Sequence, residues 1–213
     1  AAAAGFGPLH QGSDGAGSIR MPSHFCGIFG LKPSFGRVPN SPVANGDQSS
    51  HVGPMTRTVT DAALMLQVMS GPHPSDHYSL ESEPLNYSTR LSGDLKGLRI
   101  AYSPDLGHAR VDNQVAIMVK KAVDDIASLG ANIEEVSPPW GKDGPDLVRF
   151  FWAVHELRFR PLLDEWADRM DPGLVACIKS AGDPSAEDYL KMRQRKLDYI
   201  AAIHRWFEDW DLL

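Results

Sequence analysis

Apolar residues recur at helical spacing between residues 58 and 69. Thr58 and Asp61 stand at the spacing of a capping box at the start of this pattern, and Gly71-Pro72 follows its end. The apolar positions that form one stripe are Val59, Ala62, Leu66 and Met69. These features predict an amphipathic helix over residues 58–69.

A strand, a helix and a second strand are predicted within residues 97–137. The segments GLRIAYS at 97–103 and NIEEVS at 132–137 have patterns typical of strands. Between them, Asp112 is placed to cap a helix that Gly130 ends. The apolar positions of that helix are Val115, Val119, Ala122, Ile126 and Leu129. A connection of this length predicts a right-handed βαβ unit with two parallel strands.

Helical spacing dominates the last third of the chain. Residues 145–170 are apolar on almost all sides, whereas residues 185–210 are amphipathic. The WDLL segment at 210–213 has the pattern of a strand that is just beginning. Turn-forming residues predict loops at 40–54 and 70–94.

These elements predict an α/β protein. At 213 residues, the chain is long enough for one large domain or a tight pair. Its segments are a glycine-rich part with a short strand (1–39), a helix plus the βαβ unit (53–139) and a helical region (145–211).

Composition and charge exclude several function classes. The net charge of −6 argues against a broad nucleic-acid surface, because phosphate binding needs clustered lysines and arginines. The longest basic run, KMRQRK at 191–196, is interrupted by apolar residues at helical spacing, which favours a solvated helix face. No apolar run approaches the roughly 18 residues of a membrane span. We therefore predict neither a nucleic-acid partner nor a membrane partner.

Cysteine and histidine usage adds two expectations. Cys26 and Cys177 are too few for a disulfide framework in a chain of this size, which favours a reducing, cytoplasmic compartment. The histidines are scattered, and His73 and His77 fall in a proline-rich loop. Because zinc needs three or four converging ligands, we predict no metal, and we predict no cofactor.

The stretch GSDGAGSIRMPSHFCGIFGLKPSFGRVP at 12–39 is the most distinctive part of the sequence. Its glycines at 12, 15 and 17 disfavour a helix and suit a backbone that bends sharply. Three interpretations compete: a structural turn, a phosphate cradle, or a nucleophile beside an oxyanion hole. The phosphate cradle matches weakly, because GFGPLHQG has His10 where the third glycine of a Gly-x-Gly-x-x-Gly motif belongs.

The nucleophile interpretation starts from Ser18. Successive N–H groups at and before this residue can point into one concavity that suits a tetrahedral oxyanion. The four amides are those of Gly15, Ala16, Gly17 and Ser18. The serine would still need a base, because an unassisted hydroxyl is a poor nucleophile at neutral pH.

The same stretch closely resembles the signature segment of the amidase signature family, serine hydrolases that use a Ser–cis-Ser–Lys triad. The resemblance continues through GPMTRTVTDAALMLQVMSG at 53–71 and, more weakly, over 97–137. It implies a mixed, twisted β-sheet wrapped by helices, incomplete at both ends. The nucleophile of the family's GSDxGGSIRxP run falls on Ser18, and Ala16 departs from the glycine that the family usually has.

The resemblance also implies roles for other residues of the motif. It places the oxyanion hole on the backbone of residues 15–18, and it implies that Asp14 and Arg20 pair to hold the shape of the loop. Ser13 either hydrogen-bonds near the catalytic groups or belongs to the turn. Cys26 and Lys32 are interpreted as structural.

Two members of the family's triad are not found in the sequence. In the family the lysine lies far upstream, and the cis-serine belongs to a GGSSGG run that would stand just before Ala1. No SSGG occurs among the 213 residues. We therefore expect the chain to be an internal portion of a longer amidase and to be inactive by itself.

The reaction implied by the resemblance is hydrolysis of a linear carboxamide to a carboxylate and ammonia or an amine, through an acyl intermediate on Ser18. A small-molecule amide is the expected partner, and a homo-oligomer stays open. One alternative is the glutamine-hydrolysing subunit of a tRNA-dependent amidotransferase; another is a non-catalytic binding module with the amidase fold. The aromatic residues within 149–159 either line an apolar acyl pocket or belong to the core.

Overall fold

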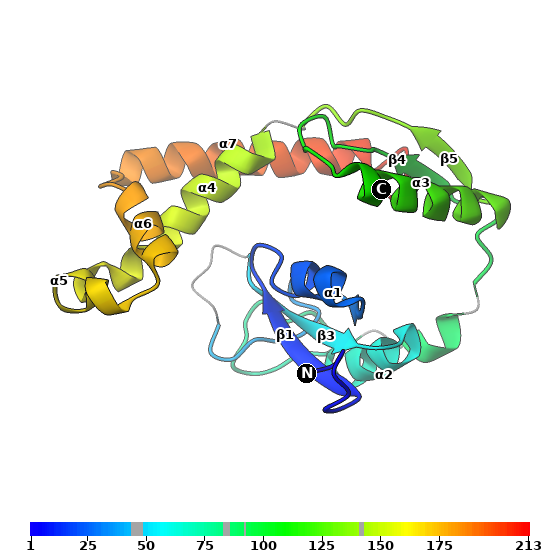
Figure 1. The fold of residues 1–213 in the computed structure, drawn as a ribbon, viewed down its shortest axis with the longest axis horizontal. Coiled ribbons are helices and arrows are strands. Elements are labelled where there is room, and N and C mark those ends of the chain that lie inside the picture. The colour runs from blue at the N-terminus through cyan, green and yellow to red at the C-terminus, as the bar shows by residue number, and fades with distance from the viewer. Residues whose placement is uncertain (44–48, 83–85, 92, 141–142) are drawn as a thin grey trace. The chain divides into compact units, whose positions relative to one another are not determined.

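The fold is described from a computed structural model of the chain. The described residues are 1–43, 49–82, 86–91, 93–140 and 143–213. The chain divides into two compact units, Ala1–Gly93 and Asp94–Leu213 (Figure 1). Within the described residues, the first unit holds a three-stranded antiparallel sheet and the second a two-stranded parallel sheet, so the predicted α/β class is confirmed.

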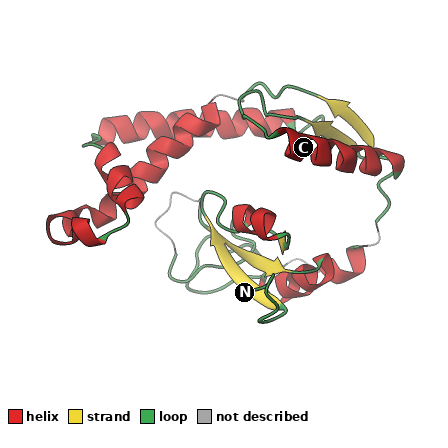
Figure 2. Cartoon of the chain, in the orientation of Figure 1, coloured by secondary structure: helices red, strands yellow, loops and turns green. Residues whose placement is uncertain are grey.

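In the first unit, the strand β3 (His51–Thr56) lies between β1 (Leu9–Asp14) and β2 (Phe29–Gly30), and both pairings are antiparallel. Figure 2 colours strands yellow and helices red. The loop expected at 40–54 is therefore wrong for residues 51–54, which belong to the central strand, and its residues 44–48 lie outside the described ranges. Glycine and proline are unfavourable inside strands, and both occur in this segment. Although Pro54 has no N–H to donate, its carbonyl oxygen accepts a hydrogen bond from the N–H of Leu31 at 3.1 Å.

Gly53 is required in β3 because other backbone passes very close to it. A Cβ atom at this position would lie 2.1 Å from the carbonyl oxygen of Leu31 and 2.9 Å from Cδ of Pro33. Neither a main-chain oxygen nor a proline ring can rotate away. The close approach of residues 31–33 to β3 therefore depends on the absence of a side chain at Gly53.

Gly53→Ala is expected to lower the free energy of unfolding by about 1–3 kcal/mol, because the added methyl group overpacks the strand approach. Denaturant unfolding of the purified protein measures this change. Gly93→Ala is the matched control, since the nearest atom to its added Cβ is the Arg90 carbonyl oxygen at 3.9 Å. We expect the control to stay within about 0.5 kcal/mol of wild type. Equal losses in the two variants would contradict the prediction.

Two helices pack on this sheet, α1 (Arg20–Cys26) on β2 and α2 (Val59–Met69) on β3. The Thr58 hydroxyl accepts the N–H of Asp61 at 3.0 Å, which confirms the predicted start of α2. The short helix α1 is not predicted by the sequence pattern, because it follows the glycine run directly and has no apolar stripe. Its end is marked by Gly27, whose φ of +63° is left-handed.

The apolar core of the first unit lies between the sheet and α2. A loop and a 3₁₀ helix, η1 (Tyr87–Arg90), also contribute to it. The buried members are Val38, Val52 and Leu66, with Leu31, Met69 and Tyr87 packed against them. The segment 70–94, expected as a loop, therefore supplies one core contact through η1.

The second unit begins with the predicted βαβ arrangement. The strands β4 (Arg99–Tyr102) and β5 (Asn132–Glu135) pair in parallel, and α3 (Asn113–Ser128) connects them. The Asp112 carboxylate accepts the N–H of Gln114 at 2.8 Å and so caps α3 as predicted. The predicted order of strand, helix and strand and the predicted parallel pairing are confirmed.

Residues 211 and 212 meet the other edge of β4. The N–H of Ala101 donates to the carbonyl of Leu212 at 3.0 Å, and the N–H of Asp211 donates to the carbonyl of Arg99 at 2.9 Å. The Asp211 carboxylate also accepts the N–H of Arg99 at 2.8 Å. The parallel bridge between Ile100 and Leu212 confirms the strand beginning predicted in WDLL.

The remainder of the second unit is helical, as predicted. In chain order its elements are α4 (Asp143–Glu156), η2 (Leu157–Leu162), α5 (Leu163–Trp166), η3 (Ala167–Arg169), α6 (Pro172–Ser180) and α7 (Ala186–Trp206). The predicted run at 145–170 is broken after Glu156, because Pro161 lacks the N–H that a continuing α-helix needs. Helix α4 packs on α6 and α7 (Figure 1). In the described part of the chain, no helix combines the length and the apolar character needed to cross a membrane.

Candidate active site

The strand β1 delivers the glycine-rich stretch to a tight turn. The strand ends at Asp14, residues 15–19 form bends and a turn, and α1 begins at Arg20. Gly17 has φ of +110°, a left-handed conformation that favours glycine. Ser18 is exposed in this turn, directly before the first helical turn of α1.

The residue after Ser18 anchors the turn to the sheet. Ile19 is fully buried. One glycine from each strand makes room for its side chain: Gly12 of β1, Gly30 of β2 and Gly53 of β3. A Cβ atom added to these glycines would lie 2.9, 3.0 and 3.2 Å, respectively, from a side-chain carbon of Ile19. The position of Ser18 is thus restrained by the buried side chain of the next residue, Ile19.

The carboxylate of Asp14 organises the turn from inside. Asp14 is fully buried. Its Oδ1 accepts the N–H of Gly17 at 2.7 Å, and its Oδ2 accepts the N–H groups of Ile19 and Arg20 at 3.2 and 3.3 Å. The Arg20 guanidinium adds two bonds of 2.9 Å, from Nε to Oδ2 and from Nη2 to Oδ1. The structure therefore brings together the two residues that the family resemblance paired.

These bonds decide the ionisation of Asp14. Burial by itself raises the pKa of the carboxyl, because it removes water from the charge. The hydrogen bonds from the Arg20 side chain and from the amides of Gly17 and Arg20, together with the charge of Arg20, outweigh burial and hold the pKa of Asp14 well below its usual range. The Arg20 side chain keeps 54% of its surface exposed, so the ion pair alone contributes little. The amide bonds to a buried charge contribute more.

The Asp14 bonds also predict a pH dependence of stability. The folded state holds the pKa of this carboxyl below its ordinary value of 3.8. The stabilisation is thus fully present above the ordinary pKa and is lost as the pH falls below it toward the folded-state value. Between about pH 6 and pH 3, wild type should lose stability more steeply than Asp14→Asn, as measured by denaturant unfolding. Parallel pH profiles of the two proteins would contradict the prediction.

The amides of the turn are not all available for an oxyanion. The N–H of Gly17 already donates to Asp14, which corrects the expected set of four donors. Among the described residues, the N–H groups of Gly15, Ala16 and Ser18 meet no protein acceptor, and all three residues are exposed. Leu106 is the one non-glycine residue with positive φ in the described ranges, so the methyl group of Ala16 causes no backbone strain.

Within the described ranges, the remaining motif residues make no hydrogen bond with Ser18. Ser13 is exposed on β1, opposite Val52. The half-buried Lys32 donates from Nζ to the carbonyl of Pro33 at 3.0 Å. Burial lowers the pKa of Lys32, and the charge of Arg20 lowers it further. Cys26 is exposed at the end of α1.

His51 also belongs to this site, although no sequence pattern indicates it. Its Nδ1 lies 3.2 Å from the carbonyl oxygen of Asp14 and 2.8 Å from that of Ser49. The residues His51 and Asp14 face each other across the β1–β3 pair, 37 positions apart in sequence. No local pattern signals a contact of this range, because it depends on the strand pairing.

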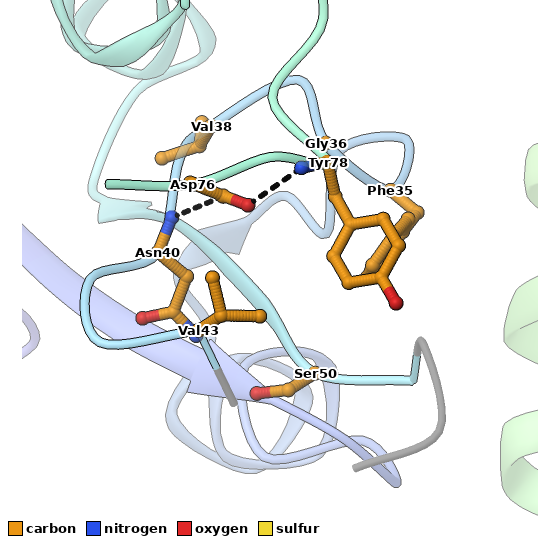
Figure 3. Close-up of a pocket in the computed structure, with 8 residues that line it drawn as sticks. All are labelled: Phe35, Gly36, Val38, Asn40, Val43, Ser50, Asp76 and Tyr78. Carbon is orange, nitrogen blue, oxygen red and sulfur yellow. Dashed lines mark hydrogen bonds between the residues drawn. The ribbon is translucent and has the colours of Figure 1, made fainter. Parts of the chain in front are cut away.

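A small pocket lies in the same unit (Figure 3). Its lining residues are Phe35, Gly36, Val38, Asn40, Val43, Ser50, Asp76 and Tyr78. The buried Asp76 carboxylate accepts the N–H groups of Asn40 and Tyr78 at 2.8 and 2.9 Å, so it bridges two loops. The cavity volume of about 20 Å³ suits a single water molecule, not an amide substrate.

No metal centre emerges from the described residues, and the aromatic residues of α4 take part in packing between helices. No group of three histidine, cysteine, aspartate or glutamate side chains within them is arranged to hold a metal ion. In the predicted aromatic segment of α4, Phe150 and Phe151 are half-buried and Trp152 is exposed. The Phe151 ring packs edge-on against the Tyr189 ring, with centroids 5.9 Å apart, so it helps join α4 to α7.

The whole chain, residues 1–213, matches the Amidase family. The chain belongs to this family. An acylamidase from Rhodococcus erythropolis is 44% identical over 217 residues, which cover 100% of this amidase-family chain and 45% of the acylamidase. A glutamyl-tRNA(Gln) amidotransferase subunit from Staphylococcus saprophyticus is 43% identical over 145 residues, which cover 68% of the chain and 30% of that protein. The chain thus spans less than half the length of these relatives.

Solved structures of other proteins share the fold. A bacterial aryl acylamidase of the amidase signature family matches with a TM-score of 0.87 and 26% identity, over 99% of this chain and 46% of that protein. The 6-aminohexanoate cyclic dimer hydrolase matches with a TM-score of 0.84 and 24% identity, over 99% of this chain and 47% of that one. The expected amidase signature fold is confirmed by these matches.

Proposed function

We propose that this chain is the nucleophile-bearing part of an amidase that hydrolyses a linear carboxamide through an acyl intermediate on Ser18. One observation carries the proposal: an exposed serine lies in a turn that a buried, ionised aspartate holds in shape, and three amides of that turn make no hydrogen bond to the described residues. Such preorganised donors stabilise an oxyanion strongly, because no free energy is spent on reorienting them during the reaction.

In the proposed reaction, Oγ of Ser18 attacks the amide carbon and its proton passes to a base. The carbonyl oxygen becomes an oxyanion that accepts hydrogen bonds from the free amides of Gly15, Ala16 and Ser18. Collapse of the tetrahedral intermediate breaks the C–N bond, and the amine or ammonia leaves with a proton. Water then attacks the acyl-serine, which releases the carboxylate and restores the hydroxyl.

The base is proposed to come from outside this chain's own motif. Among the described residues, none makes a hydrogen bond with the Ser18 hydroxyl. We propose that a neutral lysine and a cis-serine, as the family resemblance implies, relay the proton in a longer protein that contains these residues. Alone, the 213-residue chain would then show no appreciable turnover.

The relatives support an acyl amide as the substrate class. The acylamidase match extends over the whole chain, whereas the amidotransferase match extends over 68% of it. The solved aryl acylamidase also covers nearly all of the chain. An amide with an aryl leaving group, such as 4-nitroacetanilide, is therefore the first substrate to test, and glutamine is the second.

A fluorophosphonate probe tests the proposal directly. We expect the full-length protein to be labelled, and peptide mapping to place the label on Ser18, because the probe reacts with serines that are activated for attack. Ammonia release from glutamine without cleavage of 4-nitroacetanilide would favour the glutamine-hydrolysing alternative. If the protein is neither labelled nor active, the non-catalytic module is favoured.

A further inference from the structure

The contact between His51 and Asp14 has a defined direction. The Nδ1 atom lies 3.2 Å from the Asp14 carbonyl oxygen and 2.8 Å from the Ser49 carbonyl oxygen. Carbonyl oxygens only accept hydrogen bonds, so the hydrogen must be on Nδ1. The ring therefore donates to both carbonyls, and one of them is the last carbonyl of β1.

Neighbouring groups hold the His51 ring in this orientation. The Phe35 ring packs edge-on against it, with centroids 5.6 Å apart and planes at 81°. Burial lowers the pKa of His51 and the charge of Lys32 lowers it further, which together outweigh the two carbonyl bonds and the charge of Asp14. The ring is thus neutral near pH 7 and donates from Nδ1 without adding charge to the site.

The Asp14 carbonyl shares its peptide group with a proposed oxyanion donor. A peptide unit is planar and trans, so the N–H of Gly15 points opposite to the carbonyl of Asp14. A bond that fixes this carbonyl therefore fixes the direction of the Gly15 N–H. The same residue holds the rest of the turn through its carboxylate.

We infer that His51 is a positioning residue for the acylation of Ser18. By holding the carbonyl of Asp14, it aims the Gly15 N–H at the place where the oxyanion forms. This inference rests on the function proposed above. It assigns no contact between His51 and the substrate; the effect passes through a single peptide plane.

Three variants of the full-length protein separate the hydrogen bond from the bulk of the ring. His51→Asn places an amide nitrogen where Nδ1 stood, His51→Gln reaches too far to do so, and His51→Leu removes the donor. With 4-nitroacetanilide, we expect His51→Leu and His51→Gln to lower kcat about tenfold and to change KM by less than about twofold, because the oxyanion forms in the transition state and is absent from the bound substrate. We expect the kcat of His51→Asn to stay within about threefold of wild type.

His108→Leu is the matched control. His108 also places Nδ1 near a carbonyl oxygen, that of Leu106 at 3.1 Å, but in an exposed loop of the second unit. We expect it to keep the wild-type kcat. Turnover of His51→Asn as slow as that of His51→Leu would overturn the inference. Wild-type turnover of His51→Leu would also overturn it.

Amide hydrogen exchange of the peptides that cover residues 14–20 separates this inference from the proposed function. Faster exchange in His51→Leu and near wild-type exchange in His51→Asn support positioning even if fluorophosphonate fails to label Ser18. Equal exchange in wild type and His51→Leu overturns it, even if Ser18 is labelled.

Discussion

Ser18→Ala is expected to lower the rate of amide hydrolysis by the full-length protein at least about a thousandfold, because it removes the atom that forms the acyl bond. Release of 4-nitroaniline from 4-nitroacetanilide measures the rate. Since Ser18 is exposed, the melting temperature should not change. A variant that keeps more than about a hundredth of the wild-type rate would contradict the assignment.

Ser75→Ala is the control for this experiment. Ser75 is an exposed serine of the same unit, and its N–H rather than its hydroxyl makes the contact with the His73 ring. We expect unchanged turnover and unchanged labelling. A label that maps to a serine other than Ser18 would contradict the assignment of Ser18 as the nucleophile.

Asp14→Ala is expected to lower the free energy of unfolding by more than about 3 kcal/mol, because buried amide donors lose their acceptor. The N–H groups of Gly17 and Ile19, two buried residues, would remain without a partner. Asp14→Asn keeps one acceptor oxygen and should fall between Ala and wild type in denaturant unfolding. Asp125→Asn is the control, since it breaks an exposed ion pair with Lys121 and should change little. Equal effects at Asp14 and Asp125 would contradict a stabilising role of the buried carboxylate.

Local signals explain what the sequence predicts of the fold. The start of α2 depends on Thr58 and Asp61, three residues apart, and α3 depends on a cap at Asp112; both are visible in the sequence. The central strand β3 is not predicted, because Gly53 is explained by contacts with Leu31 and Ile19, which are distant in sequence. A glycine that makes room for another segment looks the same, in sequence alone, as a glycine that makes a turn.

The candidate site likewise has features that the sequence predicts and features that it does not. The motif resemblance places Ser18, Asp14 and Arg20 in one short segment, so their proximity follows from the sequence. The use of the Gly17 amide by Asp14 does not, because it depends on the path of the backbone within the turn. His51 lies outside the motif and reaches the turn through strand pairing, which sequence periodicity does not specify.

The bridge between β4 and residues 211–212 has a consequence for synthesis on the ribosome. The bonded residues Arg99 and Asp211 lie 112 positions apart. Until Asp211 emerges from the ribosome, the edge of β4 that pairs with residues 211–212 stays unpaired, while the segment between them is translated. An open strand edge is a template for pairing with other chains, and contacts of such long range form slowly. Nascent copies of this unit should therefore depend on chaperones more than its helical content suggests.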